Sequence, residues 1–287
     1  MTRPQYLTKE ALTTFISSAL AEDIGEGDHS SLAAIPANAT NKAKLLFKDD
    51  GIIAGLELAE KIFHHYDPEL SITFKKKDGD LMRKGEVAFV VEGSSQSLLS
   101  TERLVLNCMQ RMSGIATYTH RLCKMIEGTT AQLMDTRKTT PNFRLPEKWA
   151  VLIGGGLNHR YALYDMIMLK DNHIDMAGGI ENAINNTKAY LAKQNKKLKI
   201  EVETRNLEEV KEVLRVGGAD VIMLDNMSPQ LMKEAVAIIN GQCKTEASGG
   251  ITELTLRAVA ECGVDFISVG ALTHSVKSLD LSLKVFE

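Results

Sequence analysis

Four cationic side chains follow or lie between short apolar runs in the middle of the sequence. They are Arg137, Lys138, Arg160 and Lys170. Arginine binds carboxylates and phosphates in bidentate geometry, and lysine adds a compact positive charge. The group therefore suits a substrate that carries several carboxylates or phosphates. The alternative is a set of ordinary surface ion pairs with aspartates that are near in the sequence: Asp135, Asp165 and Asp171.

Carboxylates form a second group further along the chain. Glu201 and Glu203 are two residues apart in a run that is expected to be a strand, so their side chains share one face. Asp225 ends the next apolar run. Glu203 and Asp225 could hold Mg²⁺ or stabilise a positive charge that develops on a substrate. The alternative is a pair of interior carboxylates that pair with lysine.

Glycine-containing segments form a third group. Ser248-Gly249-Gly250 and Gly270-Ala271 each follow an apolar run. Backbone N–H groups in such loops, together with the start of a helix, can bind a phosphate. The alternative is a tight turn that needs a positive φ angle. The three glycines at 154–156 precede Asn158-His159-Arg160 and would let the backbone approach another group closely.

Apolar runs that alternate with amphipathic helices would position these groups. Six strand-like runs cover residues 132–134, 166–169, 199–202, 221–224, 243–247 and 266–269. The last four begin about 22 residues apart, which is the repeat of one strand and one helix with short loops. No GxGxxG motif follows any of them, so a dinucleotide-binding fold is disfavoured and a βα barrel is favoured. Catalytic groups of such barrels lie where strands end, and members of all three groups above lie at strand ends.

The first part of the sequence has a different pattern. Leu12, Ile16 and Leu20 recur at helical spacing, with Thr8 at the N-cap position. Short strand-like runs separated by turn residues follow, which predicts an α+β domain with antiparallel strands. A long helix is predicted over about 96–126, and Ser113-Gly114 is expected to be the place where it could break.

The composition is that of a globular protein without a polyanion-binding surface. The chain has 287 residues, with 34 Lys and Arg against 37 Asp and Glu, for a net charge of −3. We therefore expect no nucleic-acid partner and no membrane partner. Four scattered cysteines without CxxC spacing argue against a zinc site and favour a reducing compartment. The N-terminus lacks the apolar core of a secretory signal, so we expect a cytoplasmic protein.

Several motifs together resemble the quinolinate phosphoribosyltransferase family. In chain order they are EDIGEGD at 22–28, ER at 102–103 with Asn107, SGIAT at 113–117, DTRKTTP at 135–141, GGG at 154–156, NHR at 158–160, KDNHI at 170–174, EVE at 201–203, LDN at 224–226, SGG at 248–250 and VGALTHS at 269–275. They span nearly the whole chain in the order of the family, so the combined resemblance is highly specific.

The resemblance implies an α/β protein with an incomplete, seven-stranded βα barrel and an N-terminal α/β (α+β) sandwich domain. The sandwich would occupy residues 1–113 and the barrel residues 114–273, and a C-terminal segment at 274–287 would pack back on the N-terminal domain. Members of the family form homodimers with shared active sites, so a homodimer or a higher oligomer is expected. The apolar runs predict six strands, one fewer than the family's barrel.

The resemblance also implies a reaction, a step of de novo NAD synthesis with Mg²⁺ as cofactor. Quinolinate and phosphoribosyl pyrophosphate would give nicotinate mononucleotide, CO₂ and pyrophosphate. Lys138, Glu203 and Asp225 would be catalytic, and the two carboxylates are the candidates for contact with Mg²⁺. The residues expected to bind substrate are Arg103, contributed across the dimer, with Thr136, Arg137, Lys138, His159, Arg160, Lys170, Glu203 and Asp225. The residues expected to bind the 5′-phosphate are Ser248, Gly249, Gly250, Gly270 and Ala271.

One segment departs from the family's pattern. Many bacterial members have Leu-Pro-Gly after the Arg-Lys-Thr motif, whereas residues 140–148 here are TPNFRLPEK, with basic residues kept at Arg144 and Lys148. We expect this change to affect how the loop closes on substrate rather than the activity itself.

Three alternatives remain open. They are a phosphoribosyltransferase that acts on nicotinate without decarboxylation, a barrel relative associated with molybdate transport, and a non-catalytic paralogue that binds a phosphorylated metabolite. A mono-acid needs fewer cationic groups than this sequence supplies, which disfavours the first. The presence of Lys138, Glu203 and Asp225 disfavours the last.

Overall fold

The protein is described by a computed structural model that covers residues 3–286, and these residues form two compact units. Unit 1 contains the described parts of Met1–His120, Thr139–Gly155 and Leu272–Glu287, and unit 2 contains Arg121–Lys138 and Gly156–Ala271. The two compact units therefore differ from the continuous segments that the resemblance suggests, which are bounded at residues 113 and 273.

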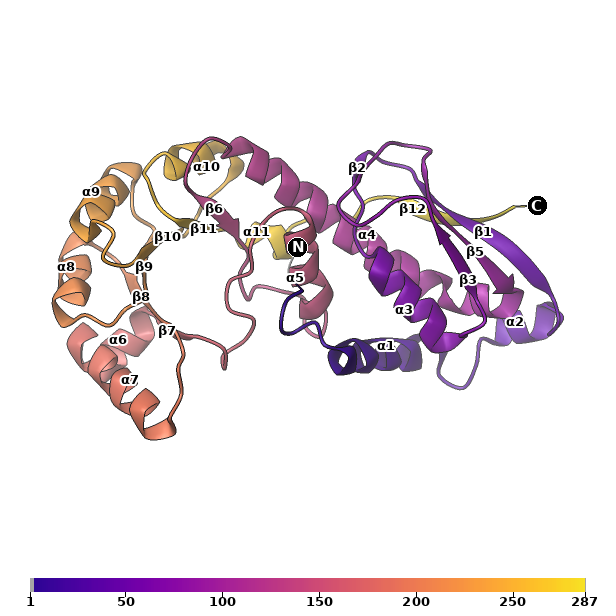
Figure 1. Ribbon diagram of the computed structural model, residues 1–287, viewed down its shortest axis with the longest axis horizontal. Helices are drawn as coiled ribbons and strands as arrows, with labels where there is room; N and C mark the ends of the chain where they lie inside the picture. Colours follow the sequence, from indigo (N-terminus) through magenta and orange to yellow (C-terminus); the bar gives the residue numbers. More distant parts are fainter. Residues whose placement is uncertain (1–2, 287) are drawn as a thin grey trace. The chain divides into compact units, whose positions relative to one another are not determined.

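Unit 1 contains a four-stranded antiparallel sheet (Figure 1). Its four strands are, in spatial order, β12 (Leu281–Phe286), β1 (Thr40–Phe47), β5 (Val87–Ser94) and β3 (Ser71–Phe74). The last strand of the chain, β12, pairs with β1 from Lys42↔Phe286 to Phe47↔Leu281. A small sheet of β2 (Gly51–Ile52) and β4 (Leu81–Met82) accompanies the larger one. The C-terminal segment is thus an edge strand of unit 1.

Helix α3 (Leu56–Tyr66) packs on this sheet, and α1 (Lys9–Ile24) packs against α3. The short helix α2 (His29–Ala34) lies between them in the sequence. Thr8 Oγ1 accepts a hydrogen bond from the N–H of Ala11 at 3.1 Å, which confirms the predicted N-cap of α1. Phe63 of α3 meets Phe89 of β5 edge to face, with ring centroids 6.0 Å apart. These contacts fix α3 on the sheet.

The long helix α4 (Ser95–Met125) runs without interruption, so the predicted break at Ser113-Gly114 is wrong. The hydroxyl of Ser113 accepts the N–H of Ala54 at 3.0 Å, so it satisfies backbone outside the helix rather than disrupting it. A Cβ on Gly114 would lie 2.4 Å from the carbonyl oxygen of Lys277. Glycine is therefore required by the close approach of the C-terminal segment and not by a kink.

The segment 139–155 joins unit 1 through a buried ion pair. Its helix α5 (Arg144–Ile153) carries Glu147, whose side chain is completely buried. Arg111 of α4 donates to Glu147 Oε1 from Nε at 3.1 Å and from Nη2 at 2.9 Å. Thr140 donates its N–H and its hydroxyl to the same carboxylate at 2.9 and 3.0 Å. One carboxylate therefore ties α4, α5 and the start of the loop that departs from the family.

Unit 2 is built on a parallel sheet, and the six predicted strands are confirmed. In spatial order they are β6 (Gln132–Met134), β11 (Phe266–Ser268), β10 (Lys244–Ser248), β9 (Val221–Asp225), β8 (Ile200–Thr204) and β7 (Ile167–Leu169). Leu157 forms a single parallel bridge with Met134 on the open side of β6. The seventh strand that the family implies is thus reduced to one bridged residue, too short to leave an apolar run in the sequence.

Helices cover the outside of this curved sheet (Figure 1). They are α6 (Asp171–Ala177), α7 (Ile180–Gln194), α8 (Leu207–Val216), α9 (Pro229–Ile239) and α10 (Glu253–Ala260), while the short α11 (Ala271–His274) follows β11. Each strand except β6 is therefore followed closely by a helix, as the repeat predicted. Among residues 3–286, no helix has both the length and the apolar character needed to cross a bilayer.

The C-terminal strand offers a test of packing in unit 1. Leu281 is 3% exposed on β12, whereas Val285 on the same strand is 62% exposed. Leu281→Ala should lower the free energy of unfolding by about 2–5 kcal/mol, because it removes buried methyl groups and leaves a cavity. Val285→Ala, the matched control, should change it by about 0.5 kcal/mol or less. Urea denaturation measures both, and equal losses would contradict this account of β12.

Candidate active site

The parallel strands of unit 2 all end at one edge of the sheet, and most of the predicted site residues lie there. Those that end a strand or follow it are Thr136, Arg137 and Lys138 after β6, Lys170 after β7, Glu203 on β8, Asp225 on β9, Ser248, Gly249 and Gly250 at β10, and Gly270 and Ala271 after β11. Ser248 pairs directly with Asp225 across β10 and β9, so these strand ends are level. Arg103 lies on α4 in unit 1, with an exposed side chain.

Glu203 and Asp225 form an acidic pair at the ends of neighbouring strands. Glu203 is 9% exposed. Burial raises the pKa of Glu203, and the charge of Asp225 raises it further, while the charge of Lys170 and the N–H of Asp171 oppose the rise. The two carboxylates are therefore close enough to repel each other, which favours a cation or a developing positive charge beside them.

Arg137 and Arg160 form the cationic part of this edge. Burial lowers the pKa of Arg160, and the nearby charge of Arg137 lowers it further. Nη1 of Arg160 donates to the carbonyl oxygen of Met166 at 3.2 Å, which fixes one side of the guanidinium. Two guanidinium groups whose charges act on each other suit a ligand with more than one negative charge.

Asp135 organises the backbone beside these cations. Its carboxylate is completely buried, so the alternative in which Asp135 is a surface ion-pair partner is wrong. Oδ1 accepts the N–H of His159 at 2.9 Å, and Oδ2 accepts Nδ2 of Asn158 at 2.6 Å. The end of β6 is thereby tied to the segment that carries Arg160.

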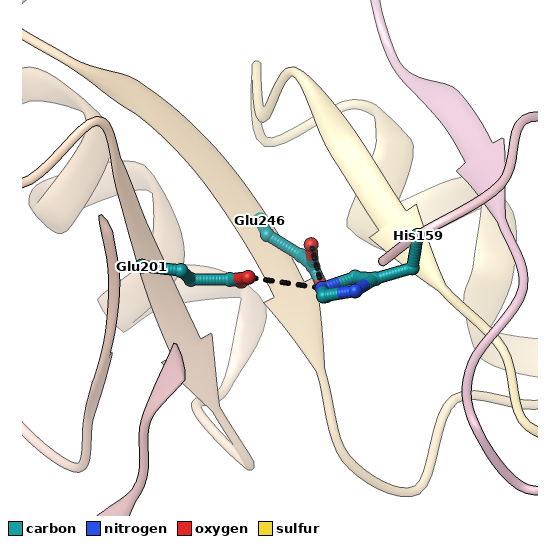
Figure 2. Close-up of side chains that lie close together, drawn as sticks. All are labelled: His159, Glu201 and Glu246. Atoms are coloured by element: carbon teal, nitrogen blue, oxygen red, sulfur yellow. Dashed lines mark ion pairs between the residues drawn. The ribbon is translucent and has the colours of Figure 1, made fainter. Parts of the chain in front are cut away.

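Three ionisable side chains face one another one layer deeper in the barrel (Figure 2). His159, Glu201 and Glu246 are 8%, 1% and 1% exposed. Nε2 of His159 lies 2.9 Å from Glu201 Oε2 and 3.4 Å from Glu246 Oε2. Sequence reasoning placed His159 in the substrate site and did not single out Glu246. The available signal was a glutamate in the middle of a buried strand, with its side chain on the inward face.

Protons are retained in this cluster. Burial raises the pKa of Glu201 to about 7, and the charge of Glu246 adds to the rise while His159 opposes it. Burial acts to lower the pKa of His159, but the two carboxylates outweigh it and raise that pKa. Taken alone, the raised pKa of His159, about 10, would favour an imidazolium. The geometry opposes this, because a second ring proton would have to occupy Nδ1, which already accepts the N–H of Arg160 at 2.7 Å. We therefore assign the additional proton to the carboxylates.

The loop after β10 is shaped by two glycines. Gly249 and Gly250 have φ angles of +89° and +61°. A Cβ on Gly249 would lie 2.3 Å from Oδ1 of Asn226, so glycine is required there on two grounds. Thr252 is the N-cap of α10, and its N–H donates to Thr255 Oγ1 at 3.0 Å. The loop thus leads into a helix N-terminus, an arrangement that can bind phosphate.

Comparisons with known proteins cover both halves of the chain. The family model for the N-terminal domain of quinolinate phosphoribosyl transferase matches residues 28–113, and that for the C-terminal domain matches residues 115–284. The chain belongs to the quinolinate phosphoribosyltransferase family.

Individual members of the quinolinate phosphoribosyltransferase family match over most of their length. A chloroplastic nicotinate-nucleotide pyrophosphorylase (carboxylating) of Arabidopsis thaliana is 49% identical over 96% of this chain and 82% of its own. A quinolinate phosphoribosyltransferase (decarboxylating) of Nicotiana tabacum is 46% identical over 94% and 81%. The solved nicotinate-nucleotide pyrophosphorylase from Francisella tularensis matches with a TM-score of 0.90 and 36% identity, covering 99% of this chain and 100% of that one. The predicted fold class is confirmed by this agreement.

The repulsion between the carboxylates of Glu203 and Asp225 predicts that ionised Glu203 lowers the free energy of unfolding. Because folding raises the pKa of Glu203, the protonated form is favoured in the folded state, and stability falls as pH rises from the ordinary glutamate pKa through the raised value. In metal-free buffer near pH 7, Glu203→Gln should therefore unfold at a temperature higher by about 2 °C. Below about pH 4 the difference should vanish, because Glu203 is then protonated in both states.

Thermal unfolding across pH measures this difference. Glu209→Gln is the matched control, since it weakens a surface ion pair in which Arg205 Nη2 lies 2.8 Å from Glu209 Oε1. That variant should be unchanged or slightly less stable. A lower unfolding temperature for Glu203→Gln at pH 7 would contradict the electrostatic account of the acidic pair.

Proposed function

We propose that this protein transfers a phosphoribosyl group to quinolinate and decarboxylates the product. Quinolinate and phosphoribosyl pyrophosphate would give nicotinate mononucleotide, CO₂ and pyrophosphate. The observation that carries the proposal is the presence, at one edge of one sheet, of the cationic pair Arg137 and Arg160 and the acidic pair Glu203 and Asp225. A dianionic acceptor and a ribose that becomes cationic require these two kinds of group side by side. The named relatives support the same reaction.

Quinolinate would bind at the cationic part of the edge. Its two carboxylates are adjacent on the pyridine ring, so Arg137 and Arg160 can each pair with one of them in bidentate geometry. This pairing would hold the ring nitrogen toward the ribose. The other residues expected to contribute to this subsite are Thr136, Lys138, His159 and Lys170.

Transfer would occur at the acidic pair. The pyridine nitrogen attacks C1′ of the ribose while the bond from C1′ to pyrophosphate breaks. Glu203 and Asp225 would stabilise the positive charge that develops on the sugar, and Lys138 and Lys170 would neutralise the departing pyrophosphate. Backbone N–H groups of the Ser248-Gly249-Gly250 loop, and of Gly270 and Ala271, would hold the 5′-phosphate.

Mg²⁺ fits the acidic pair chemically. Glu203 and Asp225 offer hard carboxylate oxygens, and their mutual repulsion, which contributes to the raised pKa of Glu203, would be relieved by a divalent cation. When bound, Mg²⁺ would supply charge neutralisation for the pyrophosphate leaving group.

Decarboxylation needs no further cofactor. Alkylation places a positive charge on the pyridine nitrogen, next to the carbon that bears the 2-carboxylate. The bond from that carbon to the carboxylate breaks, CO₂ leaves, and the electron pair left on carbon takes up a proton. The nitrogen cation stabilises the electron pair, so the protein needs only to keep the ring in place.

Purified protein with Mg²⁺, phosphoribosyl pyrophosphate and quinolinate should release CO₂ and form nicotinate mononucleotide in equal amounts. Lys138→Ala should lower kcat by about 100-fold or more while the unfolding temperature stays nearly unchanged, because Lys138 is exposed at the edge. Chromatography of the products and capture of CO₂ measure both reactions. Turnover of nicotinate without turnover of quinolinate would overturn the proposal.

We further propose a homodimer in which Arg103 of one subunit serves the site of the other. Arg103→Ala and Lys138→Ala should each be nearly inactive alone. Isolated mixed dimers should recover up to about half of the wild-type activity, because one of their two sites then has both groups. Co-expression with two different tags isolates the mixed dimers. Confirmed heterodimers with no recovery would contradict shared sites.

A further inference from the structure

Glu201 and Glu246 occupy the interior of the barrel, where branched apolar side chains are usual. They project from β8 and β10, the strands on either side of β9, and the ring of His159 points toward both carboxylates (Figure 2). Each carboxylate is 1% exposed. Within residues 3–286, neither oxygen of Glu201 nor Oε1 of Glu246 accepts a well-aligned hydrogen bond. Buried carboxylates so placed are costly, and their presence points to a role other than packing.

The ring of His159 is constrained at both nitrogens. Nδ1 accepts the N–H of Arg160 at 2.7 Å, so in this arrangement Nδ1 carries no proton and the ring proton is on Nε2. Nε2 faces the two carboxylates in short electrostatic contacts. The backbone N–H of His159 is held by Asp135. The ring is thus locked between the backbone of Arg160 and the acidic interior.

We propose that Glu201 and Glu246 are positioning residues for the quinolinate subsite. The two carboxylates select the Nε2–H form of His159 and orient its ring. Nδ1 of the oriented ring then accepts the N–H of Arg160 and fixes the backbone there. The fixed backbone places the Arg160 guanidinium at the edge of the sheet. This inference rests on the proposed function of Arg160, and it extends the site by a layer of residues that lies beneath the substrate.

Charge supports the same arrangement. The cluster carries one negative charge in either of two protonation states. In the first, the ring is neutral with its proton on Nε2, and the two carboxylates share one proton. In the second, the ring is an imidazolium and both carboxylates are ionised. That charge lies beneath two guanidinium groups that repel each other, and Glu201 acts on Arg160 in the opposite sense to Arg137. The buried layer therefore favours the close approach of Arg137 and Arg160 that a dianion requires.

A metal ion is the competing explanation. Ligand atoms of His159, Glu201 and Glu246 all lie within 4.8 Å of one another. A metal on Nε2 would need the lone pair of that nitrogen, with Nδ1 donating its proton to a neighbour. Here Nδ1 accepts a hydrogen bond instead, so Nε2 presents a proton to the carboxylates. The ring orientation therefore favours the positioning role.

Kinetics of Glu201→Gln and Glu246→Gln test the proposal. Glutamine keeps the size of the side chain and one acceptor oxygen but removes the charge that holds the ring. The KM for quinolinate should rise about tenfold in each variant, while kcat and the KM for phosphoribosyl pyrophosphate change by about twofold or less. Parallel losses in all three parameters together with a lowered unfolding temperature would overturn the proposal, since they indicate a general structural role.

The matched control is Asp265→Asn. Asp265 accepts the N–H and the hydroxyl of Thr245, both at 2.9 Å, at the end of the sheet where β10 and β11 begin. The same change from acid to amide at that end should leave the KM for quinolinate unchanged. An equal rise in KM for this variant would overturn the proposal, because it would show that any lost barrel carboxylate weakens quinolinate binding.

A double-variant cycle separates action through His159 from direct action. In a His159→Gln background, Glu246→Gln should raise the KM for quinolinate by less than about twofold, because the ring that it positions is already absent. A further independent tenfold rise would overturn the proposal. A wild-type protein that does not turn over quinolinate would instead refute the proposed function, so the two failures are distinguishable.

The protonation state of the His159 ring can be measured without an activity assay. In ¹⁵N NMR spectra of histidine-labelled protein, with His159→Gln used for assignment, His159 should show an unprotonated Nδ1 and a protonated Nε2 near neutral pH. An imidazolium or an Nδ1–H tautomer would overturn the proposal. Stoichiometric metal in the purified protein that is lost in His159→Gln would overturn it as well, in favour of a metal site.

Discussion

Parallel pairing of the strands is the constraint on which the candidate site depends. Because every strand of unit 2 runs in the same direction, residues as distant as Lys138 and Gly270 are carried to one edge of one sheet. The register then sets their depth: Ser248 is level with Asp225, and Glu203 is level with Met223, two residues before Asp225 on β9. A shift of β8 or β9 by one residue would turn Glu203 or Asp225 to the opposite face of the sheet.

The charges gathered at this edge explain how a chain with a net charge of −3 could bind a small dianion. Burial and Arg137 both lower the pKa of Arg160, and burial and Asp225 both raise the pKa of Glu203. The surroundings therefore disfavour the charged form of each group. A dianion would relieve the first repulsion, and a cation or a positively charged sugar would relieve the second. Without ligand the site is therefore electrostatically unfavourable, which is a source of selective binding.

Much of this arrangement could be predicted from the sequence, and the remainder depends on contacts between distant segments. Strand runs, the Thr8 cap and the groups at strand ends are local signals, so periodicity and residue type were sufficient. Ser113-Gly114 misled because glycine in a helix suggests a break, whereas here it admits the backbone of Lys277. The sequence places Glu246 in the middle of an expected strand, but it does not reveal which side chains Glu246 meets. His159 was noticed through its neighbours in sequence, and its ring contacts arise only in the folded barrel.

The buried layer shows what an apolar core could not provide. Replacing His159, Glu201 and Glu246 by hydrocarbon of similar volume would remove buried charge, and such exchanges are often neutral or stabilising. Hydrocarbon has no directional contacts, however, so it could not hold an imidazole with Nδ1 toward the N–H of Arg160. A guanidinium that must meet a planar dianion gains from a fixed backbone beneath it, since small misplacements of a binding group are costly. In this barrel the buried polar side chains lower the free energy of unfolding, and in return they orient Arg160.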